Sequence, residues 1–187
     1  MITDIDGIEV GNWSDIEAKT GCTVILFPEG TTASGEIRGG APATRDFSLL
    51  HPSRLVDHVD AVVLSGGSAY GLAACEGVMD FLEGRGQGFP TSAGKVPIVV
   101  GMSLFDLNEG DPSRRPCASD GREAAESASS TRTEIGAIGA GTGATVSKWR
   151  GKEYSKVGGI GSASCSSGDL IVAAHLAVNA SGDIDDG

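Results

Sequence analysis

Short apolar runs that stop at turn residues limit the folds open to this sequence. Cys22–Phe27, Val59–Ser65 and Val96–Val100 are rich in β-branched residues, and the first two run into Pro28-Glu29-Gly30 and Gly66-Gly67. Runs of this length and composition, bounded by turn formers, are typical of β-strands. Glycine accounts for 29 of the 187 residues, about twice its usual share of ~7%. Since the glycines follow no G-X-Y period, they are not those of a collagen and instead mark the ends of strands.

Two longer strands are predicted near the end of the sequence. Val157–Cys165 and Asp169–Val178 are separated by Ser166-Ser167-Gly168, which is a hairpin signal. The stretch Leu170–Val178 is apolar almost throughout. A continuous apolar run favours a central strand that is buried on both faces.

Two segments, Ser68–Gly84 and Ala118–Ser130, are predicted to be helices. In the first, four apolar residues recur at helical spacing on one face: Leu72, Cys75, Met79 and Leu82. Ser68 is the expected N-cap, and Gly84 or Gly86 the expected stop. Gly77 inside the helix predicts close packing against another element. Together these elements indicate an α/β layer structure in a single domain spanning residues 1–187.

Charge and composition exclude several classes of protein. The formal net charge of −11 argues against nucleic acid and against anionic membrane surfaces, because both bind basic faces. No apolar run approaches the ~20 residues of a transmembrane helix, and Met1–Asp4 begins no signal peptide. The four cysteines are far apart with no CxxC pair, so we expect small core residues in a reducing cytoplasm.

Cofactor and metal motifs do not match this sequence. Gly66–Gly71 lacks the GxGxxG pattern, Gly139–Lys148 lacks the Gly-Lys-Ser/Thr of a phosphate loop, and Ser68 lacks a GxSxG elbow. The three histidines have no HExxH spacing, and Asp183–Gly187 places its glycine one position too early for a calcium loop. We therefore expect no metal, no cofactor and a solvated acidic tail.

Three polar residues remain as candidates for chemistry: Tyr70 at a helix start, Lys148 in a glycine-rich segment, and Asn179 at the end of an apolar strand. Each also has an ordinary structural explanation. Tyr70 could pack with its hydroxyl outward, Lys148 could be a solvated lysine, and Asn179 could form a turn. From the residues alone, both interpretations stay open.

At these same positions the sequence resembles the L-aminopeptidase/D-esterase (DmpA-type) family, which includes β-peptidyl aminopeptidases and nylon-oligomer hydrolases. The matching stretches occur in order along the chain: Gly7–Trp13, Thr20–Gly30, Ser34–Arg45, Asp60–Val78, Gly139–Trp149 and Ala177–Asp183. None is specific alone, and jointly they cover essentially the whole chain. The resemblance implies an αββα sandwich, completed by a separate β-subunit.

The resemblance also implies roles for individual residues. Asn179 matches the family's oxyanion-stabilising Asn, and Lys148 matches a Lys assigned to activating or positioning the nucleophile. Tyr70 matches the Tyr that lines the site after a double glycine. Gly66, Gly67 and Ser68 are expected to shape the substrate pocket beside it.

Members of the family cleave themselves ahead of a Ser or Thr, which becomes the N-terminal nucleophile of a smaller β-subunit. By this resemblance we expect the present chain to be the larger α-subunit, in an assembly of about four αβ units, with the nucleophile on the partner chain. The expected activity is hydrolysis of small peptides, amides or amide oligomers through an acyl-enzyme. An ornithine-acetyltransferase-type acyltransferase and a non-enzymatic small-molecule binding protein remain as alternatives.

Overall fold

The computed structural model describes residues 1–184, so residues 185–187 of the expected acidic tail lie outside the described part of the chain. The α-helices are α1 (Ala74–Gly84) and α2 (Ala118–Glu126), and the 3₁₀ helices are Ile2–Asp4, Phe47–Leu50, Ser68–Ala73, Gly139–Gly141 and Lys152–Tyr154. The strands are β1 (Glu9–Asp15), β2 (Thr20–Leu26), β3 (Ala43–Arg45), β4 (Ala61–Ser65), β5 (Phe89–Thr91), β6 (Gly94–Val96), β7 (Val99–Ser103), β8 (Thr145–Val146), β9 (Lys156–Val157), β10 (Gly159–Ser167) and β11 (Leu170–Val178). No helix within residues 1–184 is both long and apolar enough to cross a membrane.

The central sheet has the strand order β1-β2-β4-β7-β3. Two of the predicted strands, Cys22–Phe27 and Val59–Ser65, are confirmed as β2 and β4. The third is displaced, since the strand begins only at Val99, after Pro97. Strands β4 and β7 run parallel, with Ser65 opposite Ser103. Their carboxyl ends therefore lie side by side at one edge of the sheet, where the segments that follow them meet.

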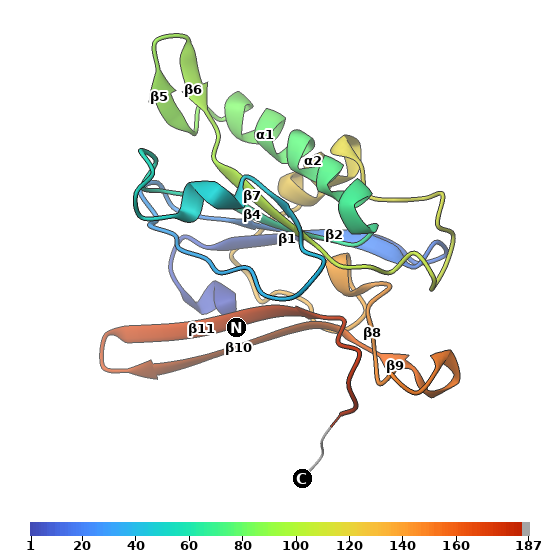
Figure 1. The fold of residues 1–187 in the computed structure, drawn as a ribbon. Helices are drawn as coiled ribbons and strands as arrows, with labels where there is room; N and C mark the ends of the chain where they lie inside the picture. Colours follow the sequence, from blue (N-terminus) through green and yellow to red (C-terminus); the bar gives the residue numbers. More distant parts are fainter. Residues whose placement is uncertain (185–187) are drawn as a thin grey trace.

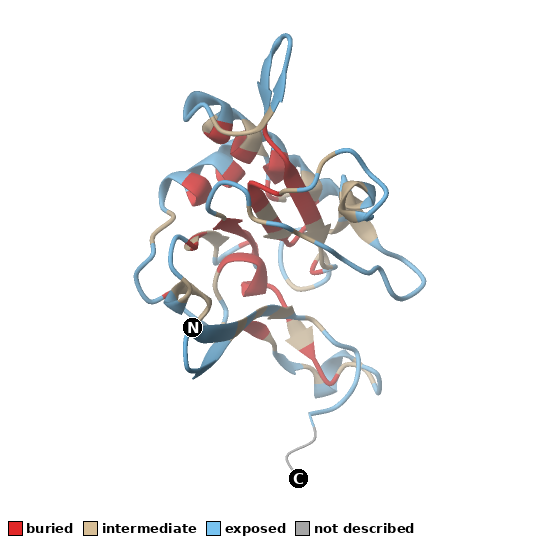
Figure 2. Cartoon of the chain, turned by 90° about the vertical axis from the view of Figure 1, so that its left-hand side faces the viewer, coloured by how far each residue is buried: buried red, intermediate tan, exposed pale blue. Residues whose placement is uncertain are grey.

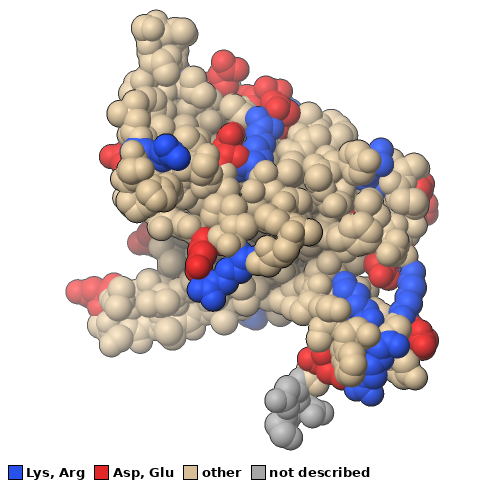
Figure 3. All heavy atoms as spheres, in the orientation of Figure 1, with Lys and Arg blue, Asp and Glu red and all other residues tan. Residues whose placement is uncertain are grey.

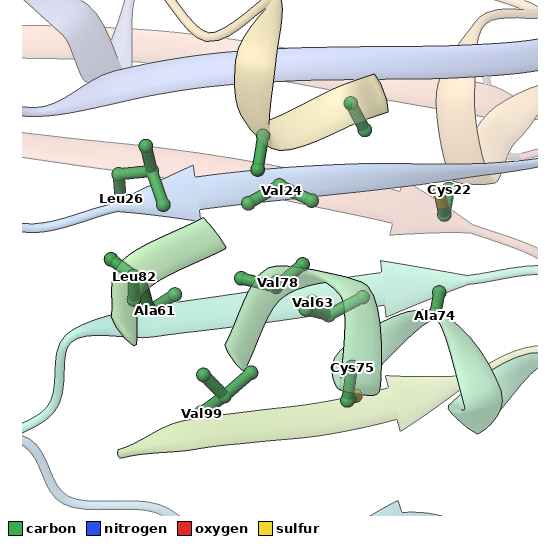
Figure 4. Packing of buried hydrophobic residues seen from close by; sticks show 12 residues of the cluster. Cys22, Val24, Leu26, Ala61, Val63, Ala74, Cys75, Val78, Leu82 and Val99 are labelled. Atoms are coloured by element: carbon green, nitrogen blue, oxygen red, sulfur yellow. The ribbon is translucent and has the colours of Figure 1, made fainter. Parts of the chain in front are cut away.

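Helices α1 and α2 cover one face of this sheet (Figure 1). The core between the helices and the sheet is formed mainly by small and β-branched side chains. Val24 and Val63 are partners on the neighbouring strands β2 and β4, and Val78 of α1 lies next to Val63 (Figure 4). The close packing expected at Gly77 is confirmed, because a Cβ there would lie only 1.7 Å from the carbonyl oxygen of Ala118 on α2. Glycine is thus needed where the two helix backbones approach each other.

The N-cap expected at Ser68 is wrong. A 3₁₀ helix spans Ser68–Ala73, its N-cap is Gly67, and α1 follows only at Ala74, although it ends at Gly84 as expected. The expectation that all four cysteines are core residues is also wrong for two of them. Cys22 and Cys75 are buried, while Cys117 and Cys165 are exposed.

The predicted hairpin is confirmed as β10 and β11, which lie across the face of the sheet opposite the helices (Figure 1). The expected burial of β11 on both faces is wrong within this chain. Only one face of the hairpin packs inward, where Ser162 Oγ accepts a hydrogen bond of 2.9 Å from the backbone N–H of Ile2. The other face leaves apolar side chains in solvent: Leu170, Val172, Leu176 and Val178. Figure 2 accordingly shows most of the hairpin as exposed.

Candidate active site

Two of the predicted residues, Lys148 and Asn179, meet at the end of the hairpin. The Lys148 ammonium donates to Asn179 Oδ1 at 2.7 Å and to Thr145 Oγ1 at 3.1 Å. The backbone N–H of Thr145 also donates to Asn179 Oδ1, at 2.9 Å, and Asn179 Nδ2 donates to the carbonyl oxygen of Phe105 at 2.8 Å. Asn179 is thus held from three sides, which fixes the position of its side chain.

This pattern determines which way the Asn179 amide faces. Its oxygen accepts from two donors, so the oxygen and nitrogen cannot be exchanged without losing both bonds. A side-chain amide carries two N–H groups, and one of them is engaged by Phe105. Among residues 1–184 the second N–H has no acceptor, so Asn179 retains one fixed donor for a bound molecule.

Lys148 places positive charge directly behind that donor. The side chain is half-buried, and burial lowers the pKa of its ammonium, while the carboxylate of Glu109 partly opposes the shift. Within the described residues, no carboxylate forms an ion pair with Lys148. Such a cation disfavours protonation of a neighbouring amine and strengthens a hydrogen bond to a developing negative charge.

The backbone between Thr145 and Lys148 is strained. Ser147 is buried, and its φ of 61° places a non-glycine residue in the left-handed region. Such conformations cost about 1–2 kcal/mol and persist only where the surroundings enforce them. Here the N–H groups of Ser147 and Trp149 donate to the carbonyl oxygens of Gly182 and Ser181, at 2.8 and 2.9 Å. The turn that presents Lys148 is therefore tied to the segment that follows Asn179.

Gly66, Gly67 and Ser68 form a second tight turn, at the carboxyl end of β4. A Cβ on Gly66 would lie 2.0 Å from Oδ2 of Asp106, and Gly67 has a φ of +76°. Ser68 follows with a φ of 55°. The double glycine is therefore required both by close approach and by backbone conformation.

Asp106, which the sequence analysis did not select, anchors this turn. Its side chain is buried, and its carboxylate accepts from the backbone N–H of Gly67 at 2.7 Å and from Thr20 Oγ1 at 2.9 Å. Burial raises the pKa of Asp106, and these two hydrogen bonds partly counteract the rise. Its neighbour Phe105 accepts from Asn179. Residues 105–106 thus join the double-glycine turn to the Lys148–Asn179 pair.

Tyr70 lies beside the double-glycine turn without contacting that pair. Its side chain is 62% exposed, and the guanidinium of Arg115 lies 4.2 Å from the centre of its ring. Within residues 1–184 its hydroxyl forms no hydrogen bond with Lys148 or Asn179. The structure therefore brings together two of the three predicted catalytic residues and leaves the third nearby.

The site is open to solvent on this chain. Five surface hollows, of about 270 to 580 Å³, have none of Tyr70, Lys148 and Asn179 among their lining residues. Two further aromatic side chains next to site residues are also exposed: Phe105 by 51% and Trp149 by 61%. Residues 1–184 contain no group of three or more His, Cys, Asp or Glu positioned to hold a metal ion.

Comparison with known proteins assigns the chain to a family. The model of "Peptidase family S58" matches residues 1–185. The chain belongs to peptidase family S58. An uncharacterized aminopeptidase of Mycobacterium leprae is 41% identical over 99% of this chain and 54% of its own length. A 6-aminohexanoate-oligomer endohydrolase of Kocuria sp. is 30% identical over 98% of this chain and 49% of its own length.

Solved structures show the same fold. A β-aminopeptidase of a Burkholderia species superposes with a TM-score of 0.74 at 21% identity, over 97% of this chain and 52% of its own. The L-aminopeptidase D-Ala-esterase/amidase of Ochrobactrum anthropi gives 0.74 at 20% identity, over 97% and 53%. Its structure is described as a variant of the Ntn hydrolase fold. The expected α/β fold class is confirmed, while its completion by a separate β-subunit stays a prediction. This S58 chain spans about half the length of the relatives that it matches.

Proposed function

We propose that this S58 chain is the α-subunit of a self-processing N-terminal-nucleophile hydrolase that cleaves small peptides, amides or amide oligomers. In this proposal, cleavage of a longer precursor creates a β-subunit with an N-terminal Ser or Thr. The observation that carries the proposal is the Lys148–Asn179 pair, which presents one fixed N–H backed by a cation. The printed names of the relatives, an aminopeptidase and an amide-oligomer hydrolase, agree with it.

The proposed reaction needs a base, a nucleophile and a donor to the oxyanion. The free α-amine of the β-subunit takes the proton of its own Ser or Thr hydroxyl, and the oxygen attacks the amide carbon. The carbonyl oxygen becomes negative, and the remaining N–H of Asn179 donates to it. Expulsion of the amine, which receives the proton, leaves an acyl-enzyme. Water then attacks the ester, and its proton returns to the hydroxyl as the acid leaves.

Lys148 acts in two ways in this scheme. Its ammonium holds Asn179 Oδ1 at 2.7 Å and so orients the oxyanion donor. Its charge also favours the neutral form of the nearby α-amine, which is the form able to accept a proton. The α-amine has an ordinary pKa near ~8, so even a small downward shift increases its neutral fraction at neutral pH.

The hairpin provides a surface for the proposed β-subunit. The outward face of β10 and β11 exposes apolar side chains, and Asp169 in the turn is the one Asp, Glu, Lys or Arg between 159 and 178. The hairpin is almost entirely tan in the space-filling view (Figure 3). Exposed apolar surface of this kind marks interaction sites. We assign this face to the β-subunit from the same precursor, in an assembly of four αβ units located in the cytoplasm.

Expression of the full-length gene tests the proposal. Intact-mass analysis is expected to show two chains, the second beginning with Ser or Thr, and the processed protein is expected to hydrolyse short peptides or amides. A single uncleaved chain without hydrolase activity would refute the proposal. Product analysis with and without an acceptor amine distinguishes hydrolysis from acyl transfer, and dominant transfer would contradict hydrolysis as the main reaction.

Variants of the pair test its assigned roles. Loss of one oxyanion donor typically reduces turnover by ~100–1000-fold, so Asn179→Ala is expected to do so per processed molecule. The exposed Asn108→Ala is the matched control. If Lys148 acts mainly by holding Asn179, the double variant with Lys148→Met turns over no more slowly than Asn179→Ala alone. Near-normal turnover in Asn179→Ala would remove this residue from the mechanism.

A further inference from the structure

Two adjacent arginines after β7 have different surroundings. Arg114 is fully engaged, because its guanidinium forms two hydrogen bonds of 2.8 Å with Asp120 and an ion pair of 3.3 Å with Asp15. It also lies 4.4 Å from the centre of the Trp13 ring. Through these contacts, Arg114 fixes the loop after β7 onto α2 and β1, which is a structural role.

Arg115 has no comparable partners. Within residues 1–184 its guanidinium forms no ion pair and donates no hydrogen bond. Its one specific contact is the stack on Tyr70, at 4.2 Å from the ring centre. The nearby Asp111 is exposed, and its carboxylate accepts from the N–H and hydroxyl of Ser113. A half-buried guanidinium therefore keeps its edge N–H groups available.

The backbone holds Arg115 in place beside the candidate site. Its carbonyl oxygen accepts from Arg114 Nη1 at 3.0 Å, and the next residue, Pro116, is fully buried. The Cβ of Arg115 would lie 3.1 Å from a Cβ on Gly67. The side chain thus starts at the double-glycine turn and extends over Tyr70, so its direction is set by the same turn that shapes the site.

The chemistry of this pair suits a carboxylate. A guanidinium is planar, with five N–H groups around its edge. Stacking on an aromatic ring occupies one face and leaves the edge free for a bidentate bond to a carboxylate. Tyr70, on whose ring the guanidinium stacks and which is 62% exposed, supplies a hydroxyl as a further donor. We propose that Arg115 and Tyr70 form a subsite for a substrate carboxylate, so that the enzyme prefers short peptides with a free carboxyl end to the same peptides in neutral form.

This inference rests on the proposed hydrolase function, and a pair of peptides tests the two separately. The full-length processed protein is assayed with alanyl-alanine and with alanyl-alanine amide, which differ in the carboxylate. Wild type is expected to show a higher kcat/KM for the free acid by ~10-fold or more, the size of a charge-assisted hydrogen bond. Arg115→Gln is expected to abolish this preference by lowering kcat/KM for the acid alone, and Arg115→Lys to retain part of it. Arg122→Gln, on the exposed side of α2, is the control and leaves both values unchanged.

The outcomes separate the alternatives. Equal kcat/KM of wild type for the two peptides, or an equal loss for both in Arg115→Gln, overturns the subsite. The second result would show that Arg115 supports the structure or pairs with the β-subunit. If neither peptide is cleaved by wild type, the proposed hydrolase activity on such peptides fails. The subsite is then decided by calorimetric binding of the same two peptides, with tighter binding of the acid by wild type than by Arg115→Gln expected and equal binding refuting it.

Discussion

Asp106 provides a direct test of how the candidate site is held together. Replacing it with Ala leaves the buried N–H of Gly67 and the hydroxyl of Thr20 without their acceptor. Each buried polar group left without a partner costs ~1–3 kcal/mol, so Asp106→Ala should lower the free energy of unfolding by ~2–6 kcal/mol. Asn is nearly isosteric. Its oxygen can accept from Gly67 and its amide can donate to the Thr20 hydroxyl, so Asp106→Asn should cost ~1 kcal/mol or less.

Urea unfolding of the full-length protein, followed by circular dichroism, measures both variants. Asp80→Ala on the exposed side of α1 is the matched control, and a surface change of this kind stays within ~0.5 kcal/mol of wild type. Hydrolase activity should follow the same order, because the double-glycine turn loses its anchor only in Asp106→Ala. Equal unfolding free energies for wild type and Asp106→Ala would refute the argument, as would equal losses in the Ala and Asn variants.

Three further results are expected. Gly77→Ala should destabilise the protein by ~1–3 kcal/mol, because its Cβ would lie 1.7 Å from a carbonyl oxygen of α2. A Cβ on Gly84 would have no atom within 4 Å, so Gly84→Ala should stabilise the protein by up to ~1 kcal/mol. The urea midpoints of the Gly77 and Gly84 variants compare the two effects. Burial raises the pKa of Asp106 in the folded state. The free energy of unfolding should therefore fall as the pH rises from about 4 through the raised pKa. Urea unfolding across that pH range should show a smaller fall in Asp106→Asn than in wild type. Leu176→Lys on the hairpin should prevent co-purification with the β-subunit, and Leu55→Lys, at a more exposed position elsewhere, should not.

The central strands and helices could be predicted from the sequence because their signals are local. Val59–Ser65 carries the composition of a strand and Gly66-Gly67 ends it, so β4 was found within two residues of its true start. Val96–Val100 was displaced because β7 begins only after Pro97 and continues through Gly101 to Ser103, where the apolar pattern weakens. Tertiary pairing with β4 and β3 determines these bounds, and no local signal reports it.

Only part of the candidate site could be predicted, because the role of Asp106 also depends on tertiary pairing. Lys148 and Asn179 stand out through the family resemblance, and the structure places their side chains in contact. Asp106 stands out in no pattern, since an acid after a strand is usually a solvated loop residue. Its importance follows from the parallel pairing of β4 with β7, which brings the two strand ends together. Paired residues of these two strands are 38 positions apart in the sequence. The strands must be placed side by side before Asp106 can be recognised as the acceptor for Gly67.

The hairpin shows why burial is harder to predict than strand formation. The apolar run Leu170–Val178 does form a strand, but its inward face is only partly covered, with Ala173, His175 and Ala177 at intermediate exposure. The outward face is entirely apolar and remains exposed, with Leu176 at 58%. Hydrophobicity indicates which surfaces a protein tends to remove from water, but it does not indicate whether the same chain or another chain covers them. The exposed, nearly uncharged strand face that ends at Asn179 is therefore the surface on which we propose that the β-subunit docks.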